Sequence, residues 1–127
     1  MTSRESVRNA LSALQSAAEK IRLVEIEARE ALFEKDDPAA YRQKLREKAT
    51  ILLELSETVA PFYEGMDKDA RAECEKGLSS FAMRAAQALE LSSIFYMSAL
   101  LYPEDYREGD PNDLESFIDR LRQKHLP

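Results

Sequence analysis

The fold is decided by residues 67–102, DKDARAECEKGLSSFAMRAAQALELSSIFYMSALLY, the longest uninterrupted helical pattern in the chain. Its small and apolar side chains recur at alternating steps of four and three residues, at Cys74, Leu78, Phe81, Ala85, Ala88, Ser92, Phe95, Ala99 and Tyr102. This spacing draws one narrow stripe along a helix, as in the seam of a helical bundle. In the last third the stripe is widened by a second set, Leu91, Ile94, Met97 and Leu101. We therefore expect a helix from Asp67 to about Leu101 whose final turns need a further cover.

Two earlier segments have the same spacing. Thr2 and Glu5 fit a capping box, which predicts a first helix from Ser3 to about Lys35. Its seam is Val7, Leu11, Leu14, Ala18, Ile21, Glu25, Ala28 and Leu32. Asp37 followed by proline predicts the start of a second helix that ends at Gly65. Its seam is Leu45, Ala49, Leu52, Ser56, Val59 and Tyr63. Because Pro61 lies in the last turn, we expect this helix to kink or stop early there.

Charge placement predicts that these two helices pair as an antiparallel hairpin. The acidic residues near the end of the first helix are Glu27, Glu30 and Glu34, and the basic residues near the start of the second are Arg42, Lys44, Arg46 and Lys48. In a hairpin they face each other, which specifies register more than it adds stability. Glu25 is the one charge on the first seam. We expect it to pair with a base across the groove, with a buried functional carboxylate as the alternative.

A short last helix is predicted by Asp110 and Pro111, which repeat the start seen at Asp37. Its apolar face is Leu114, Phe117, Ile118 and Leu121. We expect it to fold back over Ile94, Met97 and Leu101. The predicted fold is therefore all-α: an up-and-down bundle of three long helices plus a short fourth C-terminal helix, in a single domain over residues 1–127.

The overall charge disfavours several partner classes. Acidic residues outnumber basic ones 24 to 18 and the net charge is -6, so nucleic acid and anionic membrane surfaces are poor partners. The longest apolar run, residues 94–101, is too short to span a bilayer, and the N-terminus lacks a signal-type apolar core. We expect a cytoplasmic protein. The single cysteine, Cys74, lies on a seam and is expected to be a buried small hydrophobe rather than a nucleophile.

One acidic pattern suggests an enzyme. Glu27 and Glu30 on the first helix, and Glu54 and Glu57 on the second, are each spaced three residues apart. This resembles the paired acidic motifs with which all-helical nucleotide pyrophosphohydrolases hold Mg²⁺, although the last residue is Asp in that pattern. The resemblance implies metal-dependent nucleotide hydrolysis. On the seams above, however, the two pairs point away from the core and are offset by about 15 Å, which favours a solvated acidic face.

A second pattern, Arg120 followed by His125, is similar to the arginine–histidine signature of small helical ribonucleases. A cationic last turn that complements the helix C-terminus is the simpler interpretation. Because His125 is the only histidine, we expect no zinc or di-iron cofactor. Aromatic residues at the bundle ends are expected in the core, with an apolar ligand pocket as the alternative: Tyr41, Phe62, Tyr63, Phe95, Tyr96, Tyr102 and Tyr106.

The sequence favours a non-catalytic function, as an interaction, adaptor or chaperone-like module that takes a partner helix in an apolar groove. The groove is predicted at the end of the third helix and the face of the fourth, at Ile94, Met97, Leu101, Leu114, Phe117 and Leu121. Self-association through the uncovered part of this surface is the alternative use, because large exposed apolar patches mark partner sites.

Overall fold

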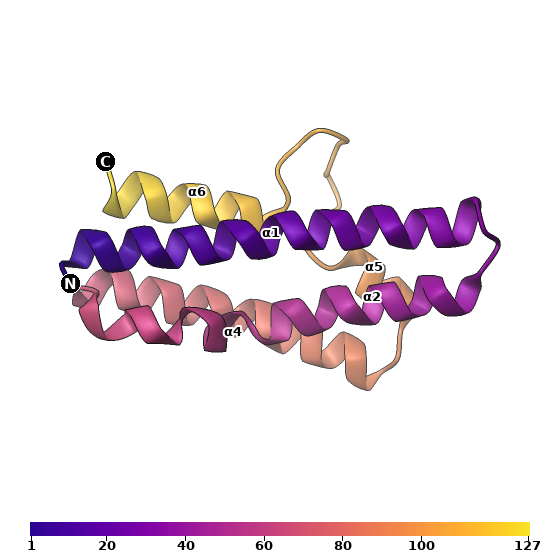
Figure 1. The fold of residues 1–127 in the computed structure, drawn as a ribbon, viewed down its shortest axis with the longest axis horizontal. Helices are drawn as coiled ribbons and strands as arrows, with labels where there is room; N and C mark the ends of the chain where they lie inside the picture. Colours follow the sequence, from indigo (N-terminus) through magenta and orange to yellow (C-terminus); the bar gives the residue numbers. More distant parts are fainter.

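A computed structural model describes all residues, Met1–Pro127, and contains only helices and their connections (Figure 1). The elements in order are α1 (Ser3–Phe33), α2 (Pro38–Leu53), α3 (Leu55–Val59), the 3₁₀ helix η1 (Ala60–Gly65), α4 (Lys68–Glu90), α5 (Ile94–Ala99) and α6 (Asp113–His125). The all-α class is confirmed. The expected division into three long helices and a short fourth differs from the structure, because the second and third helices are interrupted.

The first hairpin forms as its caps predict. The Glu5 backbone N–H donates to Thr2 Oγ1 (3.1 Å) at the start of α1, and the Ala40 N–H donates to Asp37 Oδ1 (3.0 Å) at the start of α2. Asp36 makes the turn with a φ of 49°. α1 and α2 then run antiparallel along much of their lengths (Figure 1).

The second predicted helix is divided at two places. A one-residue irregularity at Glu54 separates α2 from α3, and the hydroxyls of Thr50 and Thr58 donate to the carbonyl oxygens four residues before them (2.8 and 3.2 Å). Such side-chain bonds compete with the helical ladder and bend helices. Pro61 then lies in the 3₁₀ helix η1, where its missing N–H ends the α-helical pattern. The expected disturbance at Pro61 is confirmed, whereas the break at Glu54 was not expected.

The third predicted helix does not continue to Leu101. α4 ends at Glu90, Ser92 adopts a φ of 49°, and Ser93 caps the separate helix α5 by accepting a hydrogen bond from the Tyr96 N–H (3.1 Å). α5 folds back against α2 and α4 instead of projecting beyond them (Figure 1). The expectation of one helix to Leu101 is wrong. The apolar residues keep their helical spacing across the break at Ser92, but the helical backbone conformation is interrupted there.

The start and the position of α6 also differ from expectation. Asn112, not Asp110, is its N-cap, and Asn112 and Glu115 form a reciprocal capping box. α6 packs against α1 and α4 and lies beside the first half of α1 (Figure 1). The Phe117 ring sits on Gly77 and meets Phe81 edge to face, with 5.7 Å between ring centroids. The expected cover over Ile94, Met97 and Leu101 is therefore incorrect.

A continuous core joins these elements, and it includes the buried Cys74. Its largest fully buried apolar side chains come from every α-helix: Leu14, Ile21, Leu52, Leu55, Leu78, Met97, Leu114, Ile118, Leu121 and Val59. None of the helices combines the length and the apolar character needed to cross a membrane. Two of the hollows on the surface lie beside the segment from α5 to Asp110.

Candidate functional site

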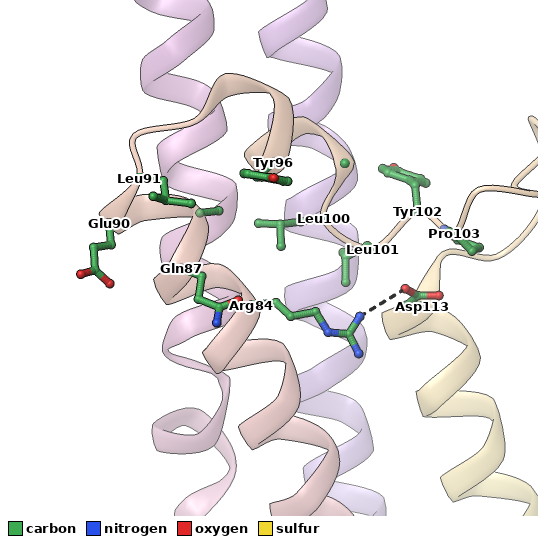
Figure 2. Close-up of a pocket in the computed structure, with 12 residues that line it drawn as sticks. Arg84, Gln87, Glu90, Leu91, Tyr96, Leu100, Leu101, Tyr102, Pro103 and Asp113 are labelled. Atoms are coloured by element: carbon green, nitrogen blue, oxygen red, sulfur yellow. Dashed lines mark ion pairs between the residues drawn. The ribbon is translucent and has the colours of Figure 1, made fainter.

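The first hollow is an apolar cleft between the end of α4 and the segment that follows it (Figure 2). Its volume is about 790 Å³. Its walls are Arg84, Gln87, Ala88, Glu90, Leu91, Tyr96, Ala99, Leu100, Leu101, Tyr102, Pro103 and Asp113. The cleft lies where α4 stops at Glu90 and the chain returns through α5.

Large apolar side chains border this cleft and face solvent. We call Leu91, Ile94, Phe95 and Tyr96 the α5 patch; their exposed fractions are 64%, 37%, 73% and 54%. Phe95 and Tyr96 contact each other edge to face, with 5.5 Å between ring centroids. Scattered apolar residues are normal on a protein surface, but four within six positions beside a cleft are typical of a partner site.

Charges mark the two ends of the cleft. Glu90 points outward beside Leu91 at one end, and Arg84 extends toward Asp113 at the other (Figure 2). The Arg84 Nη1–Asp113 Oδ2 distance is 3.9 Å, and both side chains are more than one third exposed. Arg84 also donates to Ser80 Oγ (3.1 Å). This long, solvated ion pair contributes little and leaves the guanidinium free to contact another molecule.

The residues predicted from sequence to form the groove lie mostly inside the fold. Ile94 belongs to the α5 patch, and Leu101 lines the cleft although it is itself buried. The remaining four are also buried in the core: Met97, Leu114, Phe117 and Leu121. The cleft therefore shares only the end of the third predicted helix with the predicted groove, and the apolar face of α6 takes no part in it. Its exposed apolar surface comes from neighbouring residues that the groove prediction did not name.

The second hollow has a polar floor built around a buried ion pair. Lys48 Nζ lies 3.0 Å from Glu25 Oε2 and donates to the Ser98 carbonyl oxygen (3.1 Å). The Tyr102 hydroxyl contacts both Glu25 carboxylate oxygens (2.6 and 2.7 Å). Burial lowers the pKa of Lys48, and the carboxylate of Glu25 opposes this effect. Burial and the bond to Glu25 raise the pKa of Tyr102 well above its usual value. The prediction that Glu25 pairs with a base across the groove is confirmed.

Arg22 extends this polar cluster to α6 and to the preceding loop. Its guanidinium pairs with both Glu115 carboxylate oxygens (2.6 and 3.3 Å) and donates to the hydroxyls of Tyr102 (3.2 Å) and Tyr106 (3.5 Å) and to the Asp110 carbonyl (3.3 Å). The hydrogen bond to Glu115 is the main reason that the pKa of Arg22 is raised. The cluster thereby ties residues 102–115 to α1.

These groups lie in a cavity of about 690 Å³, which also brings Tyr41, Tyr102 and Tyr106 together. Lys48, Glu25 and Arg22 are each satisfied by other groups of the chain. The arrangement is therefore suited to holding the loop against the bundle. Sequence reasoning missed Lys48 because it was assigned to the basic face. Its position three residues after Leu45 and four before Leu52 is nevertheless a seam spacing.

The acidic pairs do not converge. Glu27 Oε1 lies 3.5 Å from Lys44 Nζ, as the hairpin register predicts. No three acidic, histidine or cysteine side chains are placed so that they hold one metal ion, so Glu27, Glu30, Glu54 and Glu57 form no shared coordination site.

The second sequence pattern does not form a joint site either. Arg120 lies over the Phe117 ring, with its Cζ atom 5.9 Å from the ring centroid. His125 Nε2 instead lies 3.3 Å from Glu73 Oε2 on α4. The two side chains of the predicted signature therefore have different partners.

Comparisons of the chain with protein-family models, with curated proteins and with solved structures found no match in any of the three.

Proposed function

We propose that the protein is a non-catalytic binding module, of an adaptor or chaperone-like kind, whose apolar cleft takes an apolar segment of a partner protein. The observation that carries this proposal is the α5 patch, in which Leu91, Phe95 and Tyr96 are each more than half exposed beside a cleft of about 790 Å³. Covering such side chains removes apolar surface from water, at about 25 cal/mol per Å² before the costs of association.

The shape and lining of the cleft suit an apolar side chain on a helix. Ala88, Ala99 and Leu100 provide a wall without charge, and Arg84 and Glu90 provide polar ends that fix the orientation of a bound segment. Amphipathic helices bind such surfaces through apolar residues three and four positions apart. The proposed binding surface is therefore formed by exposed side chains next to the groove residues predicted from sequence.

A helical peptide library displayed on phage tests this function. The immobilised full chain is used at a density too low for its copies to meet, and selected peptides are then measured by fluorescence anisotropy. We expect enriched peptides with paired apolar residues and micromolar affinity. Tyr96→Ser and Leu91→Ser should each weaken binding at least tenfold.

Met83→Ser is the matched control. Met83 lies on α4 and is 64% exposed, the same fraction as Leu91, which directly follows α4. Unlike Leu91, Met83 does not line the cleft. Its substitution should leave binding unchanged. If no peptide is enriched, or if the selected peptides bind the Tyr96 and control variants equally, the proposed function is wrong. Circular dichroism of each variant checks that the fold is retained.

A further inference from the structure

The cleft and the α5 patch together form a surface with both a protrusion and a hollow. Phe95 is 73% exposed and is not part of the cleft wall, whereas Tyr96, its neighbour, lines the cleft. A two-fold contact uses the same surface on both subunits, so that surface must complement itself. An exposed aromatic ring beside an apolar hollow meets this requirement, because each copy offers a ring and receives one.

The charges at the ends of the cleft are arranged in the same self-complementary way. Arg84 and Glu90 lie on either side of Gln87, about 9 Å apart along α4 at 1.5 Å per residue. If two copies of α4 cross antiparallel at Gln87, each arginine faces the other copy's glutamate. A parallel arrangement would instead place like charges together, which is unfavourable across an interface.

We infer that the occupant of the cleft is a second copy of this chain, packed about a two-fold axis near Gln87 with Phe95 of each copy in the cleft of the other. This inference rests on the proposed function and specifies the partner. Asp113 is the other charged group beside Arg84, at 3.9 Å, and it competes only weakly for the guanidinium because both side chains are solvated.

Charge reversal tests this inference, with the solution mass measured by light scattering over a range of concentrations. The full chain should approach twice its 14.5 kDa mass as concentration rises. Each single variant, Arg84→Glu or Glu90→Arg, places two like-charge pairs in the interface. Each variant should therefore weaken dimerisation about tenfold. The double variant Arg84→Glu/Glu90→Arg should recover most of that loss. Phe95→Ser should give a monomer, and the Met83→Ser control should not.

Failure of this inference and failure of the proposed function give different results. A chain that stays monomeric at all concentrations but binds selected peptides through Tyr96 overturns the second copy as partner and leaves the binding module intact. A dimer that neither charge reversal weakens also overturns the inference, because its interface is elsewhere. A monomer that binds no peptide overturns both.

Discussion

Lys48 Nζ lies 3.0 Å from Glu25 Oε2, and this ion pair joins α1 to α2 with both side chains withdrawn from solvent. The Lys48 cation also lies 5.0 Å from the centre of the Tyr102 ring, so it holds the segment after α5 as well as the hairpin. Removing two charges from water is costly, and such a pair persists only with good geometry and additional hydrogen bonds. Here Ser98 and Tyr102 supply those bonds.

The two members of this ion pair should be strongly coupled in their contribution to stability. Lys48→Met keeps most of the side-chain volume but leaves Glu25 buried without a cation, which should cost about 3 kcal/mol in the free energy of unfolding. Glu25→Leu/Lys48→Met should lose clearly less than the sum of the two single variants. Urea unfolding of the four proteins measures the coupling. Simple additivity would contradict the assigned ion pair.

Cys74 should make stability fall in alkaline solution. Its burial raises the pKa of the thiol to about 11 from an ordinary value of 9.0. Between these values the unfolded chain loses the proton and the folded chain keeps it, so the unfolded state gains stability as pH rises. Two pKa units correspond to about 2.7 kcal/mol once both states have lost the proton, and about half of this is lost by pH 10.

The measurement is urea unfolding of the wild type and of Cys74→Ala at pH 8 and pH 10. Other groups that titrate in this range contribute to both proteins, so the difference between their slopes isolates Cys74. We expect the steeper loss in the wild type. Equal slopes would show that the folded thiol ionises as readily as the unfolded one.

Gly77 should tolerate no side chain, because a Cβ atom there would overlap the Phe117 ring. Gly-to-Ala changes at exposed helix positions normally stabilise a helix by about 1 kcal/mol. Gly77→Ala should instead cost about 2 kcal/mol through overpacking. Adding Phe117→Leu should recover part of the loss, as thermal unfolding will show. A stabilised Gly77→Ala protein would contradict the packing of α6 on α4.

Local signals in the sequence were enough to place several helix starts. Thr2, Asp37 and Asp67 are all caps in the structure, because a cap depends only on the next three residues. Ser92 and Ser93 carried a similar signal. This capping signal was overlooked because the apolar residues before and after it keep one continuous helical spacing. Such spacing alone does not distinguish one long helix from two shorter helices.

The cleft and the α5 patch were harder to predict from sequence because both depend on the break at Ser92. With one helix to Leu101, Phe95 would lie on the seam, whereas the turn at Ser92 places it in solvent. Lys48 was hidden for another reason. A search for apolar spacing skips charged residues. A buried lysine such as Lys48 can be predicted only from an acidic residue on the facing seam, which here is Glu25.

Hydrogen–deuterium exchange of the full chain, measured with and without a saturating selected peptide and at low and high protein concentration, tests most directly where this protein binds. We predict that slowed exchange appears in residues 84–103, around the cleft and the α5 patch, while α1 is unchanged apart from the turns near Arg22. Slowed exchange along α1 and α6 with none in residues 84–103 would contradict the account, because the binding surface would then lie on the opposite part of the bundle.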